Sequence, residues 1–286
     1  MNAIFMAQTM INGINLSDEE FNLIRELVYD RFGISLGDHK RTLIIERLQK
    51  MLRTGGFTTF KDYYDHVTNE PTGQALLGFI DRVSTHHTFF FRENDHFEFL
   101  KSNILPEIID KMKKRGKIDL RIWCAGCSSG EEPYSVPMVI SKFFEENKIS
   151  GEFGVLATDI SVTSIEKAGE GVYQAAQLAH VPPQMRHKYF TMAGDENVIV
   201  KANLKKNVLF RRLNLMRDIY PFKGLFNIIF CRNVMIHFDG PTRKTLIEKY
   251  HRYTEAEGYL FIGHSESIDR SPQIYKYIKP AVYQKI

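Results

Sequence analysis

The sequence predicts an α/β protein in two parts, an all-helical N-terminal domain and a larger domain built on a parallel sheet. The chain has 286 residues, a length that favours two domains over one. Apolar residues recur at helical spacing over 17–85, whereas strand-like and helix-like segments alternate after residue 118. Such alternation calls for parallel strands joined by right-handed crossovers.

Four helices are predicted in the N-terminal domain, 17–85. Each has apolar residues at helical spacing, and their ranges are 17–32, 38–54, about 60–67 and about 76–83. The first begins at a capping box, Ser17-Asp-Glu-Glu20, and the second ends at Gly55-Gly56, a typical C-terminal cap. On the second helix Arg47, Lys50 and Arg53 are spaced by three along one flank, which a solvated helix face would also explain.

The larger domain, 95–286, is predicted to begin with a helix over 94–115 that Pro106 kinks or divides. The predicted strands are 118–124, 153–158, 225–231 and 258–263, and the predicted helices are 131–147, 161–169 and 240–257. The alternation breaks over 171–208, where alternating apolar residues and a Gly194-Asp195 turn indicate an inserted hairpin-like element. The tail 274–285 is expected to add one more strand, an antiparallel edge.

The composition is that of an ordinary globular protein, with 43% hydrophobic and 25% charged residues, which excludes disordered and fibrous classes. A net charge of +4 and a pI of about 8.8 are too small an excess to require a nucleic-acid partner. Residues 1–16 are uncharged but lack the features of a signal peptide, so we expect a flexible tail. No run of about 18 apolar residues occurs, and no membrane insertion is expected.

Three cysteines are too few for a disulfide framework, so we expect a reducing compartment, the cytoplasm. Cys124 and Cys127 have CxxC spacing, but a structural zinc site needs about four ligands and Cys231 is the only other cysteine. We therefore expect no metal. The sequence also has no Gly-x-Ser-x-Gly elbow, so a nucleophile-based hydrolase is unsupported.

The strongest local motif is a small-residue loop, Gly126-Cys-Ser-Ser-Gly130, followed by Glu131 and Glu132. A strand runs into this loop and a helix leaves it, which lets a ligand approach the backbone at the carboxyl end of the sheet. Two acids at the helix start would repel phosphate, so the loop favours a cationic or hydroxyl-bearing ligand. A tight strand-to-helix turn without a ligand is the alternative.

Other polar residues follow the remaining strands. Asp159 ends the second strand, where an acid can accept hydrogen bonds from both ribose hydroxyls, although a helix N-cap explains it equally when taken alone. Arg232 and Asn233 follow the strand 225–231, and Asn214 could read an adenine edge.

Residues 86–94 are expected to form a linker or hinge that contributes to the active site. The segment Thr88-Phe-Phe-Phe-Arg92 lies within it, and core packing with a surface Arg is the alternative reading.

These segments in this order resemble the CheR family, the chemoreceptor glutamate O-methyltransferases, over about 17–285. The matching motifs are Thr88-Phe-Phe-Phe-Arg92-Glu, Ser128-Ser-Gly-Glu-Glu-Pro-Tyr134, Ala157-Thr-Asp159-Ile, Leu213-Asn-Leu215 and Phe230-Cys-Arg-Asn-Val-Met-Ile236. The resemblance implies a Rossmann-like SAM-dependent methyltransferase domain with an inserted small β-subdomain. It also implies methyl transfer from S-adenosylmethionine (SAM) to receptor glutamates, which yields glutamate methyl esters and S-adenosylhomocysteine (SAH).

The resemblance also implies the site residues. Those expected to line the cofactor site are Thr88, Arg92, Glu131, Glu132, Asp159, Asn214, Leu215, Arg232 and Asn233. Arg92 and Arg232 are expected to act in catalysis by holding a carboxylate through paired hydrogen bonds. His237 is a third catalytic candidate, in a position where the family commonly has Tyr. A glutamate with a pKa of about 4.3 is already ionised at neutral pH, so its attack on the methyl group needs no general base.

The implied partner is the acidic, helical cytoplasmic region of chemoreceptors, which Arg47, Lys50 and Arg53 would face. The turn Ala193-Gly-Asp-Glu-Asn197 looks shorter than in members that dock a receptor's C-terminal peptide, so no tight tether is expected.

Two alternatives stay open. One is a non-catalytic SAM or SAH sensor or scaffold, which His237 favours. The other is a nucleic-acid methyltransferase, which the pI suggests but the strand ending in Cys231-Arg-Asn argues against.

Overall fold

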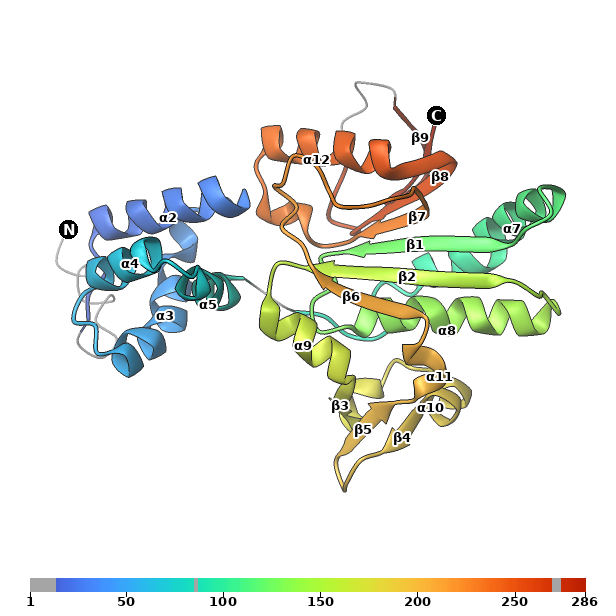
Figure 1. Ribbon diagram of the computed structural model, residues 1–286, viewed down its shortest axis with the longest axis horizontal. Coiled ribbons are helices and arrows are strands. Elements are labelled where there is room, and N and C mark those ends of the chain that lie inside the picture. The colour runs from blue at the N-terminus through green and yellow to red at the C-terminus, as the bar shows by residue number, and fades with distance from the viewer. Residues whose placement is uncertain (1–13, 85–86, 269–273) are drawn as a thin grey trace, which may run out of the picture. The chain divides into compact units, whose positions relative to one another are not determined.

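The computed structural model describes residues 14–84, 87–268 and 274–286, and its chain divides into two compact units (Figure 1). The first unit comprises the chain up to residue 85 together with 237–239, and the second comprises 86–236 and 240–286. Most of the expected flexible tail, and His86 of the expected linker, lie outside the described residues. Leu16, which the sequence placed in that tail, is buried in the first unit.

The first unit contains four α-helices in its described part, as the apolar spacing predicted. They are α2 (Asp18–Phe32), α3 (Arg41–Gly55), α4 (Phe60–Asn69) and α5 (Gln74–Val83). The capping box forms, since Ser17 N donates to Glu20 Oε2 at 2.8 Å and Glu20 N donates to Ser17 Oγ at 3.1 Å. A 3₁₀ turn, η1 (Asp38–Lys40), precedes α3, and its N-cap Gly37 makes no side-chain cap.

The short segment 237–239 belongs to the first unit although it lies far along the chain. Ile34 and Phe238 form an antiparallel bridge, and Ser35 N donates to the His237 carbonyl at 2.8 Å. Tyr29 Oη also donates to Asp239 Oδ2 at 2.8 Å. The backbone and side-chain bonds together explain why these three residues are part of the helical unit.

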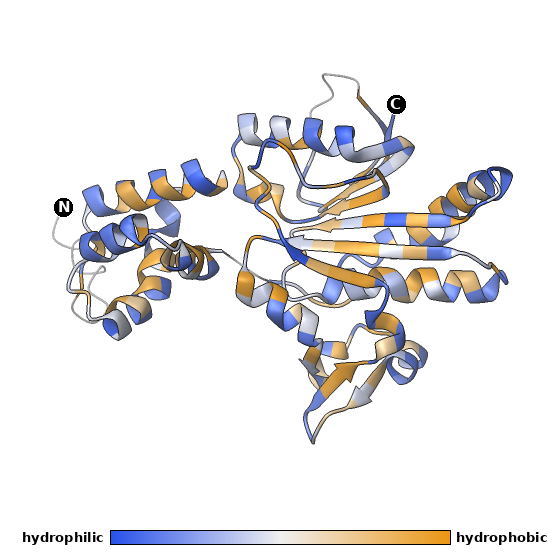
Figure 2. Cartoon of the chain, in the orientation of Figure 1, coloured by the Kyte–Doolittle hydropathy of each residue, from blue (hydrophilic) through white to orange (hydrophobic). Residues whose placement is uncertain are grey.

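The second unit is built on a seven-stranded sheet in the order β6-β2-β1-β7-β8-β10-β9. The strands are β1 (Asp119–Ala125), β2 (Glu152–Asp159), β6 (Val208–Arg212), β7 (Phe226–Cys231), β8 (Thr254–Ile262), β9 (Tyr275–Lys279) and β10 (Val282–Lys285). The first five in spatial order pair in parallel and the last two are antiparallel. The predicted fold class is therefore confirmed, and Figure 2 shows hydrophobic residues along the central strands.

The elements that differ from the prediction include β6, which was not among the predicted strands, the tail and the last helix. The tail forms a hairpin of two strands rather than one strand, because the chain reverses between Lys279 and Val282. The last helix, α12 (Gly240–Tyr253), ends four residues early and β8 begins at once. Thr254 Oγ1 donates to the Tyr250 carbonyl at 2.7 Å, which closes the helix, and Thr254 already pairs with Phe226 in the sheet.

Helices cover the sheet. They include α6 (Asp95–Phe99), a π-helical turn η2 (Leu100–Ile104), α7 (Leu105–Lys114), α8 (Glu131–Glu146) and α9 (Val162–Glu170). The π turn ends at Ile104, two residues before Pro106, where the sequence predicted a division. Helices α8 and α9 pack on β2 and β6, whereas α12 packs on β8. None of the described helices is long and apolar enough to cross a membrane.

The inserted element is a small subdomain that projects below the sheet in Figure 1. Its antiparallel strands, in the order β3-β5-β4, are β3 (Val172–Gln174), β5 (Asn197–Val200) and β4 (Phe190–Met192). A 3₁₀ turn, η3 (Ala175–Leu178), and two helices, α10 (Pro183–Tyr189) and α11 (Ala202–Lys205), complete it. The predicted hairpin-like insertion is therefore present.

Candidate active site

The candidate site lies at the carboxyl ends of four neighbouring strands. Strands β6, β2, β1 and β7 are adjacent and parallel, so the segments that follow them meet at one edge of the sheet. These segments are the glycine loop after β1, Asp159 at the end of β2, Leu213-Asn214 after β6 and Arg232-Asn233 after β7. Every motif that the sequence analysis assigned to a strand end is thus brought to this edge.

The glycine loop after β1 is held tightly against β2. The amides of Gly126 and Cys127 both donate to the Thr158 carbonyl, at 2.8 and 2.9 Å. Gly126 has a φ of +76°, and a Cβ added there would lie 2.3 Å from Val234 Cγ2. Only glycine fits this position, because both the backbone conformation and the close approach exclude a side chain.

Asp159 joins the loops that follow three strands. Its Oδ2 accepts from the Ser128 amide at 2.8 Å and its Oδ1 accepts from the Ser161 amide at 3.0 Å. Its carbonyl accepts from Leu213 N, after β6, at 2.9 Å. The N-cap of α9 is Ser161, whose hydroxyl accepts from Ser164 N. The alternative reading of Asp159 as the helix N-cap is therefore wrong. Its carboxylate instead accepts hydrogen bonds from the backbone of the loops after β1 and β2.

Arg232 is the centre of a buried ionic cluster. Its side chain is only 2% exposed, its Nη1 lies 2.9 Å from Glu132 Oε2, and its Nη2 lies 3.1 Å from Glu93 Oε2. Nη2 also donates to the Arg92 carbonyl, and Asn233 Nδ2 donates to Glu93 Oε1 at 3.3 Å. Two carboxylates flank one guanidinium, so Arg232 is bound to the protein itself. Arg232 was expected to hold a carboxylate of a ligand. In the structure both of its terminal nitrogens already pair with carboxylates of the protein.

Burial and charge shift the pKa values in this cluster in opposite directions. Burial raises the pKa of Glu132, and the nearby Arg232 guanidinium only partly offsets that effect. For Glu93, burial acts to raise the pKa, but Arg232 and the hydrogen bonds from His264 N and Asn233 outweigh it and lower the pKa. The cluster therefore contains one carboxylate that ionises readily and one that burial destabilises in its charged form.

Two buried polar side chains lie near the start of α8. Glu131 is the first residue of the helix, and Ser128 lies in the loop before it. Glu131 is 1% exposed and accepts from Ser129 Oγ at 2.8 Å, and burial raises its pKa. Ser128 has a φ of +48°, and its buried Oγ has no hydrogen-bond partner within residues 14–84, 87–268 and 274–286. Such an orphaned buried hydroxyl is costly unless a ligand or water satisfies it. Ser128 is thus the group in this loop that most clearly calls for a ligand.

The segment before α6 is partly core and partly exposed. Phe90 and Phe91 are buried, and the Phe91 amide donates to Ser135 Oγ at 3.1 Å. Arg92 is half-buried, and its Nη1 donates to the His87 carbonyl at 2.8 Å. No ion pair of Arg92 with a carboxylate occurs in the described parts of the chain. Core packing therefore explains the phenylalanines, while the Arg92 guanidinium keeps its charge uncompensated.

The remaining expected residues are divided between the two units. Asn214 Oδ1 accepts from Met216 N at 2.9 Å, and Leu215 is buried beside it in the second unit. His237 belongs to the first unit with Arg47, Lys50 and Arg53. Arg47 Nη1 donates to the Val83 and Ser84 carbonyls at 2.6 and 2.9 Å, and burial lowers its pKa. Arg47 thus caps the C-terminus of α5, and Lys50 and Arg53 are the exposed members of the expected basic stripe.

Sequence reasoning missed two glutamates. Glu93 follows Arg92 in the sequence and was not predicted as a site residue, but it pairs with Arg232. Glu266 follows β8 and accepts from Gly263 N at 2.6 Å, Asn233 N at 2.9 Å and Ile236 N at 3.1 Å. Burial raises its pKa in spite of these bonds. Glu266 follows the buried strand β8, as Arg232 follows β7. A charged residue just after a buried strand is the pattern that could have predicted it.

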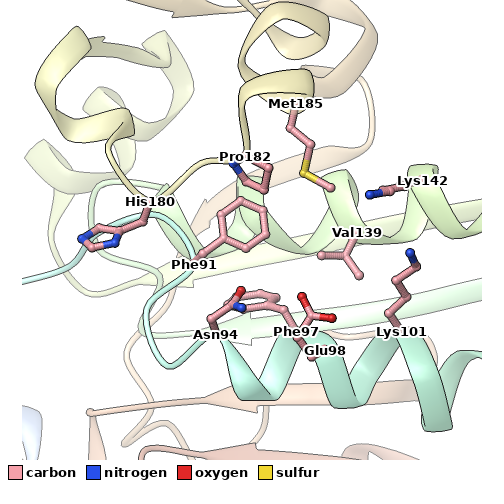
Figure 3. Close-up of a pocket in the computed structure, with 10 residues that line it drawn as sticks. All are labelled: Phe91, Asn94, Phe97, Glu98, Lys101, Val139, Lys142, His180, Pro182 and Met185. Carbon is pink, nitrogen blue, oxygen red and sulfur yellow. The ribbon is translucent and has the colours of Figure 1, made fainter.

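A separate cavity of about 340 Å³ lies between α6, α8 and the segment before α10 (Figure 3). Phe91, Phe97 and Val139 form apolar walls, and the amino groups of Lys101 and Lys142 lie at one end. None of its lining residues is an expected cofactor residue. This cavity is therefore distinct from the strand-end site.

Comparison with known proteins agrees with the geometry. A model described as the CheR methyltransferase SAM-binding domain matches residues 86–283, and one described as the CheR methyltransferase all-alpha domain matches 19–84. A chemotaxis protein methyltransferase of Borreliella burgdorferi is 41% identical over 272 residues, which cover 95% of this chain and 96% of that protein. One of Escherichia coli is 36% identical, covering 90% and 87%. The chain therefore belongs to the CheR family of SAM-dependent methyltransferases.

Proposed function

We propose that this protein transfers a methyl group from SAM to glutamate side-chain carboxylates of chemoreceptors in the cytoplasm, yielding glutamate methyl esters and SAH. Membership of the CheR family and relatives named as chemotaxis protein methyltransferases support the reaction class. The observation that carries the proposal is the strand-end site itself, in which Asp159, Glu132 and the unpartnered Ser128 hydroxyl converge.

The residues at the strand ends fit SAM. The molecule is cationic at its sulfur and its amino group, and three acids, Glu131, Glu132 and Asp159, lie at the site. Of these, Glu132 pairs with the buried Arg232. Asp159 follows β2, where an acid accepts from ribose hydroxyls, and Ser128 Oγ offers a free donor and acceptor. The other residues that would contribute contacts are Thr88, Arg92, Asn214, Leu215 and Asn233.

When bound, SAM supplies a methyl group on a positively charged sulfur, which a carboxylate oxygen can attack directly. The protein then needs to orient the two partners and exclude water, because a substrate glutamate is already ionised. The cysteines beside the site do not act as nucleophiles in this scheme. Burial raises the pKa of Cys124, Cys127 and Cys231 well above the usual range, so all three are protonated thiols.

The two arginines take different roles in this proposal. Within the described residues Arg92 donates to a backbone carbonyl and to no carboxylate, so its guanidinium can hold a carboxylate of the cofactor or of the substrate. Arg232 is engaged by Glu93 and Glu132, so it acts as a positioning residue that fixes Glu132. His237 remains a candidate donor at the position where the family commonly has Tyr.

The receptor is proposed to meet the protein through basic residues of α3. Lys50 and Arg53 are exposed on that helix and suit an acidic helical partner. The exposed turn 193–197 joins β4 and β5 of the small subdomain, and we propose that it supports no tight receptor tether. Nucleic acid is not a substrate in this proposal.

A methyl-transfer assay tests the proposal. Purified protein is incubated with methyl-labelled SAM and receptor cytoplasmic fragments, and mass spectrometry seeks additions of 14 Da on glutamates that alkali removes. Transfer to such glutamates is the expected result. SAM or SAH binding in calorimetry without any transfer would instead support the sensor or scaffold, and methylation of RNA would support a nucleic-acid substrate.

A further inference from the structure

Two histidines and a glutamate, Glu93, which pairs with Arg232, lie together in the second unit. Glu93 precedes α6, His96 is in α6 and His264 follows β8. One ligand atom from each of the three lies within 4.8 Å of the others. Segments far apart in the sequence therefore present two imidazoles and a carboxylate to one point, which is the donor set of many divalent-metal sites.

Both ring nitrogens of His96 are buried. Its side chain is 0% exposed, and neither nitrogen has a hydrogen-bond partner among the residues that the structure describes. The nearest acidic oxygen, Glu93 Oε2, is 3.5 Å from Nδ1, too long for a good hydrogen bond. A buried imidazole with two unsatisfied nitrogens costs free energy unless a ligand occupies the space beside it.

His264 has the neighbour that metal-binding histidines usually have. Its Nε2 lies 3.1 Å from Asp95 Oδ1, and Asp95 is itself held by Lys279 Nζ at 3.1 Å. A carboxylate that accepts from one imidazole nitrogen fixes the ring and makes the other nitrogen a better ligand. The His96 and His264 rings are also close, with centroids 4.7 Å apart.

The carboxylates beside the two imidazoles are those of Glu93 and Asp95. Glu93 pairs with Arg232, and Asp95 pairs with Lys279. These four charges balance, so the preference for a metal ion rests on the set of ligand atoms and not on an excess of negative charge.

We propose that Glu93, His96 and His264 form a binding site for Zn²⁺, with the fourth coordination position open to water. Zinc takes tetrahedral sets of imidazole nitrogen and carboxylate oxygen at about 2.0–2.2 Å, so the three ligand atoms move together by about 1 Å on binding. Glu93 also pairs with Arg232, so ligation draws its carboxylate away from the guanidinium. Zinc binding would therefore act on Arg232, the residue that positions Glu132.

Zinc binding to the full chain tests the site without reference to methyl transfer. Chelator-treated protein is titrated with ZnCl₂ in a calorimeter, and Co²⁺ is used separately because its visible spectrum reports tetrahedral nitrogen and oxygen ligands. The variants are His264→Gln, His96→Gln and, as a matched control, His187→Gln, an exposed histidine elsewhere in the second unit.

We expect one tight zinc per chain. Removal of a direct ligand in His264→Gln should lower the affinity by more than the about 10- to 100-fold that changes in residues supporting a ligand cause, with no change in His187→Gln. His264 is partly exposed, so this variant folds even if the buried His96→Gln does not. Absence of zinc binding by the wild-type chain would overturn the site. Equal affinities of wild type and His264→Gln would overturn it too, as would a Co²⁺ spectrum typical of octahedral oxygen ligands, which would indicate surface binding only.

Discussion

Nη1 of Arg232 lies 2.9 Å from Oε2 of Glu132, and this ion pair joins the end of β7 to the first turn of α8. The Arg232 side chain is almost inaccessible to solvent, and Glu93 occupies its other terminal nitrogen. Removing one partner of a buried ion pair is strongly destabilising, because the remaining charge is left buried without a counter-charge. The pair therefore controls both the stability of the strand-end site and the position of Glu132 within it.

Replacing Arg232 by Met should destabilise the protein strongly, because two buried carboxylates then lose their counter-charge. We expect a loss of about 3–5 kcal/mol in the free energy of unfolding, measured by urea denaturation at pH 7. The control is Arg211→Met, whose guanidinium is exposed and donates only to a carbonyl. A loss no larger than that of the control would show that the cluster is not a stabilising unit.

Replacing Asp159 by Asn should weaken SAH binding. The variant loses the negative charge that accepts from the Ser128 and Ser161 amides and that we propose receives the ribose hydroxyls. A charged hydrogen bond contributes about 1.5–3 kcal/mol, which predicts roughly a 10- to 150-fold increase in the Kd for SAH measured by calorimetry. Asp195→Asn, in an exposed turn, should leave the Kd unchanged. An unaltered Kd in Asp159→Asn would remove the ribose role.

Replacing Gly126 by Ala should cost more stability than the same change at Gly194. Both glycines have positive φ angles, +76° and +84°, so both variants bear the cost of that backbone conformation. At Gly126 the new Cβ would also lie 2.3 Å from Val234, whereas at Gly194 nothing lies within 4 Å. Overpacking adds about 1–3 kcal/mol. Thermal or urea unfolding of the two variants measures the difference, and equal losses would contradict the tight loop.

The stability gap between Glu131→Gln and wild type should change with pH. Burial raises the folded-state pKa of Glu131 above its unfolded value, so its contribution to stability is present below about pH 4.3 and is lost as the pH rises through the folded-state pKa. Gln cannot ionise, so the variant should gain stability relative to wild type between pH 4 and pH 7. Urea denaturation at a series of pH values measures this gap. The exposed control Glu152→Gln should show no such rise, and a gap that shrinks with pH would contradict the burial effect.

Reversing the charge of Lys50 and Arg53 together should reduce receptor methylation without affecting SAH binding. Arg47 is left unchanged, because it caps α5 and its loss would destabilise the helical unit. The matched control is Lys113→Glu with Lys114→Glu, two exposed lysines at the end of α7. Initial rates of methyl transfer are compared at low and physiological salt, since a charge-steered encounter is sensitive to ionic strength. Equal rates in both double variants would remove α3 as the receptor face.

The helical unit shows how much a local pattern can predict. The capping box at Ser17 and the glycine after α3 mark helix ends through bonds between residues close in sequence, so the spacing alone located them. The same holds for the alternation of strands and helices, because burial of one face requires a fixed period. Where an end depended on a distant strand, as at Thr254 beside Phe226, the local pattern placed it four residues late.

The sequence by itself determined which residues follow the strands, and therefore that Asp159, Asn214, Arg232 and the glycine loop meet at one edge of the sheet. Only the tertiary structure decided what those side chains do there. It paired Arg232 with Glu93 and Glu132, turned Arg47 onto the end of α5, and brought His96 and His264 together across more than 160 residues. The physical reason is that the periodicity of apolar residues depends on neighbours along the chain. Ion pairs and clusters of buried polar side chains depend on contacts between distant segments, and the sequence does not state how far apart these segments lie in space.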